Sequence, residues 1–228
     1  KRVQKLEELL GKGVQEDRDK RIHEKDVLER VVKALNDSIP IRDLDFKGEE
    51  LIALRSYGFL TQKPALVLAN VGDLTEDEQI KRVEALKKAA GEYKVGCAAI
   101  NGDIECELRE ITDPEEQQEY MEAMGIEERA ASTVIRAAYD ITNSMTFLTA
   151  GEKESRAWQV REGSSAVQAA DRIHSDIARG FIRAEVVPYE HLIADGSIAK
   201  AREAGHYREE GKDAIIHDGD VIYFRFNV

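Results

Sequence analysis

The 228-residue sequence is poor in several features, and each shortage excludes a class of protein. It has two cysteines, Cys97 and Cys106, too few for a disulfide framework or for a zinc site built from four cysteines. Its longest apolar run, Ala65–Ala69, has five residues, whereas a membrane-spanning helix needs about 20. We therefore expect no membrane segment and a reducing, cytoplasmic location.

The sequence also lacks the phosphate-binding pattern G-x-x-x-x-G-K-[ST]. Gly11-Lys12-Gly13 is no substitute, because it has neither the glycine spacing nor the hydroxyl residue. The chain begins without methionine inside a helical pattern, and we expect it to be the later part of a longer protein. A phosphate loop and its magnesium-holding aspartate would then lie before Lys1. We accordingly assign no catalytic residue and no metal ligand within the chain.

Charged residues are abundant but unevenly distributed. The chain carries 33 Lys and Arg against 45 Asp and Glu, a net charge of −12. Residues 41–144 hold 12 basic and 22 acidic side chains, whereas residues 1–40 hold 10 and 9. Backbone phosphates are bound by clustered Lys and Arg. A general electrostatic attraction to nucleic acid is therefore not supported, and we expect no sequence-specific DNA binding.

The first 61 residues follow a helical pattern. Apolar residues recur every three or four positions over Val3–Leu10 and again over Val27–Leu35, on either side of the glycines at 11 and 13. Pro40 ends the second helix, because proline removes a backbone donor. We expect residues 1–61 to form a helical, coiled-coil arm with a structural role.

Residues 62–144 begin with a strand–helix–strand pattern. The continuous apolar run Ala65–Ala69 is typical of a strand covered on both faces. Thr75, with Glu78 three residues later, is typical of a helix start, and Gly91 of a helix end. Val95–Ile100 then reads as a second buried strand. This order predicts two parallel strands joined by a right-handed helical crossover.

The loop after the first strand is the candidate ligand site. In open α/β sheets, ligands bind beyond the carboxyl ends of the strands. The amide of Asn70 can donate to and accept from a heterocycle, and the Asp73 carboxylate can accept from adjacent N–H donors. The small residues at 97–99 would let a flat base lie against this loop. An ordinary turn is the alternative interpretation, because Asn, Gly and Asp all favour turns.

Residues 145–228 read as a small mixed α/β module. Two short β-type runs lie at 146–149 and 156–160, and a helical pattern over 166–177 ends before Gly180. Strand patterns follow over Phe181–Val187 and Val221–Phe226, the second with apolar residues alternating along it. A hairpin, a helix and returning strands in this order fit a β-grasp arrangement.

Polar residues cluster where that helix meets the next strand. No nucleophile with a base and an orienting group can be assigned there. The simpler interpretation is that these side chains fix the helix-to-strand corner. The functional alternative is a protein or RNA contact surface made by His174, Arg179, Phe181 and Arg183, in which the two arginines flank the aromatic ring.

Several ordered motifs resemble those of one family. They include His174-Ser175-Asp176, Gly180-Phe181-Ile182-Arg183-Ala184, Phe147-Leu148-Thr149-Ala150-Gly151 and the closing Asp218-Gly219-Asp220-Val221. These segments are similar to the C-terminal TGS domain of the Obg-like ATPases, the YchF group of P-loop NTPases. Upstream, Ala69-Asn70-Val71 and Cys97-Ala98-Ala99 also match. The resemblance extends over the whole chain and is weakest in the helical arm.

The resemblance implies a multidomain α/β and α+β protein. Residues 1–61 would be most of a helical arm, 62–144 the later part of a parallel-sheet nucleotide-binding domain, and 145–228 a β-grasp TGS domain. Members of the family hydrolyse ATP, some bind GTP, both with magnesium, and they associate with ribosomes in translation or stress responses. The implied partners are a purine nucleotide and the ribosome or ribosomal RNA. This chain alone should not hydrolyse nucleotide. The alternative is a non-enzymatic module that docks a ribosome, RNA or protein partner.

The base-reading motif differs from that of the family. Obg-like proteins typically show Asn-x-x-Glu, and ordinary GTPases show Asn-Lys-x-Asp, whereas this chain has Asn70-Val71-Gly72-Asp73. A carboxylate can accept from N1–H and N2–H₂ of guanine but opposes the acceptor N1 of adenine. The resemblance favours ATP, and Asp73 keeps GTP as the alternative. The predicted base-binding residues are Asn70, Val71, Asp73, Cys97, Ala98 and Ala99.

Overall fold

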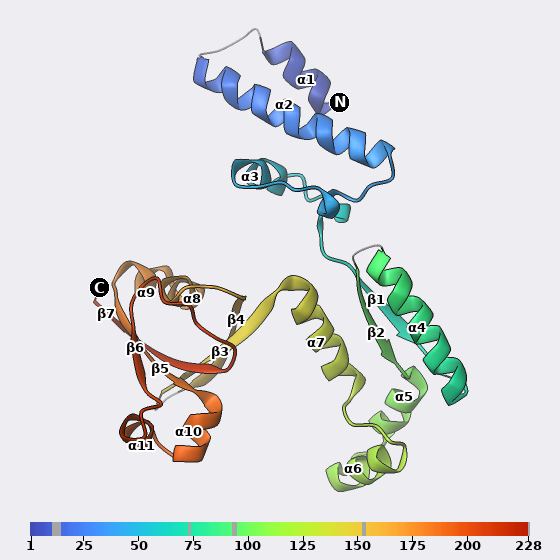
Figure 1. The fold of residues 1–228 in the computed structure, drawn as a ribbon, viewed down its shortest axis with the longest axis vertical. Coiled ribbons are helices and arrows are strands. Elements are labelled where there is room, and N and C mark those ends of the chain that lie inside the picture. Colours follow the sequence, from blue (N-terminus) through green and yellow to red (C-terminus); the bar gives the residue numbers. More distant parts are fainter. Residues whose placement is uncertain (11–14, 73, 93–94, 152–153, 228) are drawn as a thin grey trace. The chain divides into compact units, whose positions relative to one another are not determined.

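The computed structural model describes residues 1–10, 15–72, 74–92, 95–151 and 154–227. The chain divides into two compact units, Lys1–Asp103 and Ile104–Val228 (Figure 1). The finer division at residues 61 and 144 stays a prediction. Within the described ranges, no helix is both long enough and apolar enough to cross a membrane.

The first unit begins with helices that share an apolar core. Its elements are α1 (Arg2–Leu9), α2 (Gln15–Asn36), the 3-10 turn η1 (Ile41–Asp43), α3 (Glu49–Arg55) and the 3-10 turn η2 (Leu60–Gln62). The core comprises Leu6, Val27, Leu28, Val31, Ile41, Phe46 and Leu54. Val32 and Leu35 of the predicted stripe are 50% and 42% exposed, so the buried stripe is narrower than predicted. The predicted glycine turn at residues 11–13 lies outside the described residues.

The rest of the first unit is a strand–helix–strand element. Strands β1 (Leu66–Asn70) and β2 (Gly96–Ile100) pair in parallel, and α4 (Glu76–Glu92) connects them (Figure 1). The predicted order and pairing are confirmed. The prediction that β1 is buried on both faces is wrong, because Val67 and Leu68 are 37% and 43% exposed. Over the described residues this sheet has two strands, too few with α4 to cover both faces.

The second unit begins with three helices. They are α5 (Gly102–Glu110), whose first two residues belong to the first unit, α6 (Pro114–Ala123) and α7 (Ala130–Thr142). The Asp113 side chain caps α6 by accepting from the backbone N–H of Glu115 at 2.8 Å. Asn143 ends α7 in the left-handed conformation, with φ 46°. The chain then enters the sheet directly.

A five-stranded mixed sheet forms the rest of this unit. Its strands are β3 (Ser144–Ala150), β4 (Ser155–Arg161), β5 (Phe181–Pro188), β6 (Arg208–Glu210) and β7 (Asp220–Phe226). Their spatial order is β4-β3-β7-β5-β6. β3 runs parallel to β7, and the other neighbours are antiparallel. The first and last strands of the segment therefore lie side by side at the centre of the sheet.

Helices flank this sheet on both sides. Figure 1 shows α8 (Ala166–Ile173) and α9 (Ser175–Arg179) on one side, and α10 (Tyr189–Asp195) and α11 (Ile198–Glu203) on the other. The core between α8 and the sheet includes Phe147, Ala169 and Ile222. The short elements α10, α11 and β6 were not predicted.

The prediction of a single helix over residues 166–177 is wrong, because the helix is interrupted at His174. His174 has extended backbone angles, φ −163° and ψ 139°, which end α8. Its Nδ1 then accepts from the backbone N–H of Asp176 at 3.1 Å and so caps α9. One histidine thus separates two helices without glycine or proline.

Candidate functional site

The predicted ligand loop leaves β1 beside the end of β2. Asn70 and Ile100 are paired at the carboxyl ends of the two strands. The Asn70 Oδ1 accepts from the backbone N–H of Gly72 at 3.2 Å and from that of Gly102 at 3.0 Å. One carboxamide oxygen therefore ties the loop after β1 to the start of α5.

Two glycines allow the loops to approach each other closely. A Cβ atom added to Gly102 would lie 3.1 Å from Nδ2 of Asn70. A Cβ atom added to Gly72 would lie 2.1 Å from an Asp103 carboxylate oxygen. Any side chain at Gly72 would therefore have to displace the Asp103 carboxylate.

The start of α4 is fixed immediately after the loop. The Glu78 carboxylate accepts from the backbone N–H of Thr75 at 3.2 Å and from its hydroxyl at 2.9 Å. Both bonds lower the pKa of the Glu78 carboxyl below its usual value, and the bond from the Thr75 hydroxyl has the larger effect. The predicted pairing of Thr75 with Glu78 is confirmed. Val71 and Gly72 consequently follow a strand end closely, and the start of α4 is fixed at Thr75.

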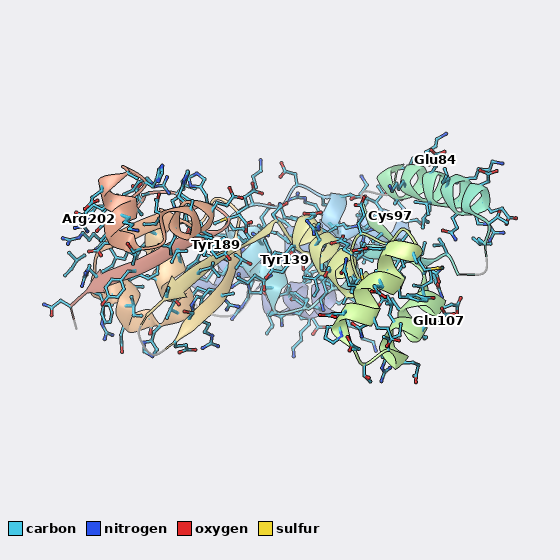
Figure 2. All side chains as sticks on the ribbon, turned by 90° about the horizontal axis from the view of Figure 1, so that it is seen from below. Glu84, Cys97, Glu107, Tyr139, Tyr189 and Arg202 are labelled. Carbon is cyan, nitrogen blue, oxygen red and sulfur yellow. The ribbon has the colours of Figure 1, made fainter. Side chains whose placement is uncertain are left out.

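The predicted base-binding residues differ in accessibility. Asn70 is exposed at the rim, whereas Val71 and Ala98 are 8% and 6% exposed and offer a ligand little side-chain surface. Cys97 (labelled in Figure 2) and Ala99 are half-buried within β2. Asp73 lies outside the described residues. The base-binding roles of all six residues stay predictions.

Sequence reasoning missed the second half of this site. Asn101, Gly102 and Asp103 follow β2 as directly as the predicted loop follows β1. The Asn101 side chain accepts from the backbone N–H of Asp103 at 3.1 Å and shapes the turn into α5. These residues could have been identified from the sequence, because the rule that ligands bind beyond the carboxyl ends of parallel strands applies to β2 as well as to β1.

Metal-binding clusters are absent from the part of the chain that the structure describes: it holds no group of three or more His, Cys, Asp or Glu able to bind an ion. The loops around Asn70 present amide and backbone groups of the kind that recognise a heterocycle. That these groups bind the base of a nucleotide stays a prediction.

Three of the four residues of the predicted partner surface are exposed, and the fourth is buried. The side chains of His174, Arg179 and Arg183 are 63%, 74% and 44% exposed. Phe181 is 5% exposed and makes an edge contact with Phe224, with ring centroids 6.1 Å apart. The expectation that Phe181 belongs to this surface is wrong, because the first residue of β5 points into the core.

Comparison with known proteins identifies relatives along nearly the whole chain. The family YchF-GTPase_C, described as "Protein of unknown function (DUF933)", matches residues 145–227. The "Ribosome-binding ATPase YchF" of Haemophilus influenzae is 44% identical over 205 residues, covering 89% of this chain and 55% of that protein. The protein of the same name from Bacillus subtilis is 38% identical over 230 residues, covering 100% of this chain and 62% of that protein.

A solved structure of a protein with the same family name is also similar to this chain. The Schizosaccharomyces pombe YchF GTPase has a TM-score of 0.77 and 25% identity, and the match covers 98% of this chain and 60% of that one. The chain thus spans about three fifths of the length of the proteins it matches. At 38–44% identity over at least 89% of its residues, the chain is similar to two proteins of the YchF group, and residues 145–227 match the YchF-GTPase_C family.

Proposed function

We propose that this chain is the later part of a protein that binds and hydrolyses a purine nucleotide with magnesium and associates with the ribosome in the cytoplasm. Relatives named ribosome-binding ATPases support this proposal, and the name of the S. pombe structure, a GTPase, keeps GTP as the alternative to ATP. In this proposal residues 1–61 are a coiled-coil arm, 62–144 contribute to the nucleotide domain, and 145–228 are a β-grasp TGS domain.

The observation that carries the proposal is the double hydrogen bond to Asn70. Its Oδ1 is occupied by the backbone N–H groups of Gly72 and Gly102, which fixes the orientation of the carboxamide. Within the described residues its Nδ2 donates to no acceptor, and the residue is exposed. A fixed N–H₂ group at the end of a parallel strand is suited to donate to a purine ring nitrogen or carbonyl.

Substitutions at Asn70 test this role in the full-length protein. Asn70→Ala should weaken ATP or GTP binding by at least about tenfold, because it removes both the oxygen that orders the loops and the donor. Asn70→Asp keeps an acceptor at the same position but loses the donor, so it should weaken binding while leaving the loops ordered. Titration calorimetry with each nucleotide measures both effects.

Asn36→Ala, at an exposed position at the end of α2, is the matched control and should bind nucleotide normally. Unchanged affinity in both Asn70 variants would remove Asn70 from base recognition. An affinity lost in Asn70→Ala but retained in Asn70→Asp would assign it a purely structural role.

The chain without the preceding sequence should be inactive as a hydrolase. Purified residues 1–228 mixed with ATP or GTP and magnesium should release phosphate at the rate of a protein-free blank, because the chain has no G-x-x-x-x-G-K-[ST] to hold the phosphates. A colorimetric phosphate assay measures this rate. Release above the blank that increases with protein concentration would contradict the prediction.

A non-enzymatic docking module is the second candidate. The exposed side chains of His174, Arg179 and Arg183 favour it, since all three lie between the start of α9 and the first residues of β5. The same preparation separates the two candidates. Co-sedimentation of residues 1–228 with ribosomes without nucleotide supports the module, whereas ribosome binding that requires both the upstream sequence and nucleotide supports the hydrolase.

A further inference from the structure

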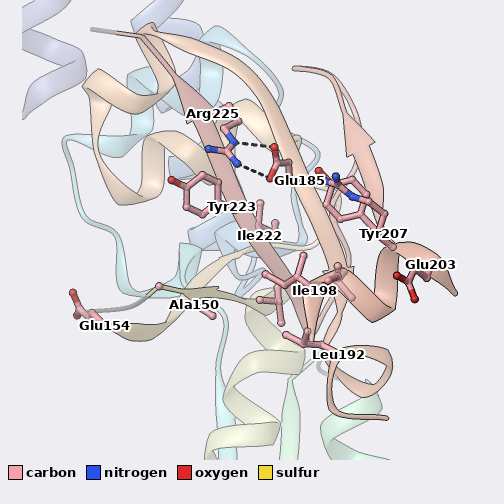
Figure 3. A pocket seen from close by; sticks show the side chains of 15 residues that line it. Ala150, Glu154, Glu185, Leu192, Ile198, Glu203, Tyr207, Ile222, Tyr223 and Arg225 are labelled. Carbon is pink, nitrogen blue, oxygen red and sulfur yellow. Dashed lines mark hydrogen bonds and ion pairs between the residues drawn. The ribbon is translucent and has the colours of Figure 1, made fainter. Parts of the chain in front are cut away.

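The sheet face that carries α10 and α11 holds a cavity of about 1240 Å³ (Figure 3). We call it the tyrosine groove, after Tyr207 and Tyr223, which line it together with side chains of β5, β7, α10 and α11. None of its residues belongs to the nucleotide loop, which lies in the other unit. The groove is therefore independent of the proposed nucleotide site.

The floor of the groove is apolar. Val187 of β5, Leu192 of α10 and Ile198 of α11 line it. Val187 is 3% exposed, whereas Ile198 is 46% exposed despite its size. An apolar side chain that covered Ile198 would gain about 25 cal/mol for each Å² of apolar surface it removed from water.

Both arginines of the groove are already engaged. Arg225 donates to the two carboxylate oxygens of Glu185 at 2.8 and 3.2 Å, and its guanidinium lies 4.4 Å from the centre of the Tyr223 ring. The Arg225 guanidinium holds the pKa of the Glu185 carboxyl below its usual value, so this pair stays ionised. Arg202 lies 4.0 Å from the centre of the Tyr207 ring. Arg225 is thus neutralised by Glu185, whereas the Arg202 guanidinium is stacked on an aromatic ring and keeps its charge.

The lining nevertheless has a net negative charge, because it contains three carboxylates and two guanidinium groups. Glu203 lines the groove and has no ion-pair partner within the described ranges. Among the residues that the structure describes, Glu154 forms one long ion pair, with Arg156 at 3.9 Å, and the two side chains are 69% and 57% exposed. Figure 3 shows Glu154 and Glu203 on opposite sides of the groove, with Leu192 and Ile198 between them. The groove therefore offers an apolar middle between two carboxylates.

We propose that the tyrosine groove binds an extended segment of a partner protein in which apolar side chains are flanked on both sides by Lys or Arg. The apolar side chains cover Ile198 and Leu192, and the flanking cations meet Glu154 and Glu203. Nucleic acid fits this face poorly, because its phosphates would face a lining in which carboxylates outnumber guanidinium groups. Charge and apolar pattern together give the groove its specificity.

A labelled synthetic peptide, KKLFLKK, tests the proposal by fluorescence anisotropy against residues 1–228. It should bind, and the charge-swapped peptide EELFLEE should bind at least about tenfold more weakly. Ile198→Arg should weaken binding of KKLFLKK at least about tenfold, because it fills the apolar floor with a cation. The double variant Glu154→Lys, Glu203→Lys should reverse the preference and bind EELFLEE more tightly than the unsubstituted chain does.

Ile193→Arg is the matched control, because Ile193 lies on α10, is 63% exposed and does not line the groove. Its affinity for KKLFLKK should be unchanged. A dissociation constant for KKLFLKK weaker than about 1 mM would overturn the proposal, as would equal losses in Ile198→Arg and Ile193→Arg. A labelled oligouridine that bound the chain and was weakened by Ile198→Arg would assign the groove to RNA instead.

Discussion

Phe147→Ala should lower the free energy of unfolding of the sheet-containing unit by about 3–5 kcal/mol. Phe147 is fully buried in the centre of β3 and makes an edge contact with Phe224, with ring centroids 6.1 Å apart. Removing the ring leaves a cavity between the sheet and α8 that small alanine side chains cannot fill. Urea denaturation measures the loss, followed by the fluorescence of Trp158, which pairs with Phe147 across β3 and β4.

Phe226→Ala provides the comparison, because Phe226 lies near the end of β7 and is 44% exposed. Phe226→Ala should lower the free energy of unfolding by at most about 1 kcal/mol. Equal midpoints for the two variants would show that the core around Phe147 is not the main source of stability of this unit.

Asp220→Ala should lower the free energy of unfolding of the same unit by about 2 kcal/mol, because it removes a buried carboxylate that accepts a backbone hydrogen bond and pairs with a half-exposed arginine. Asp220 is 2% exposed, and its carboxylate accepts from Arg208 at 3.2 Å and from the backbone N–H of His217 at 2.9 Å. Without it, the backbone N–H of His217 loses its acceptor, and Arg208 keeps only the longer contact with Glu210, at 3.8 Å, among the described residues. Thermal and urea unfolding both measure the effect.

The control for Asp220 is Asp213→Ala, at an exposed position in the loop before β7, with an expected change within about 0.5 kcal/mol. Asp220→Asn keeps one acceptor for His217 and should fall between the two. A cost for Asp220→Ala no larger than that for Asp213→Ala would mean that solvent replaces the lost carboxylate.

Elements with strong local signals were predictable from the sequence. The strands around residues 66–70 and 96–100, and the capped start of α4 at Thr75, follow from patterns that neighbouring residues complete by themselves. The exposure of Val67 could not be predicted from the local sequence, since the burial of a strand residue depends on which distant segments cover the sheet. The short helices α10 and α11 were missed, because six or seven residues carry too little periodicity and are stabilised mainly by tertiary packing.

The candidate site was predictable in position but not in geometry. Asn70 was identified because it is the first polar residue after a buried-strand pattern. Its bond to Gly102 could not be predicted, since the partners are 32 residues apart and the bond depends on the register of β1 against β2. The burial of Phe181 was missed for a similar reason: the sequence places it between two arginines, but only the sheet decides which way its ring points.

The break between α8 and α9 has a consequence for the chemistry of His174. To accept from the Asp176 N–H, Nδ1 must carry a lone pair, so a neutral imidazole here is the tautomer with its proton on Nε2. The side chain is 63% exposed. Any molecule that touches the free nitrogen of this ring therefore meets a hydrogen-bond donor, which suits a carbonyl, a carboxylate or a phosphate oxygen and repels another donor.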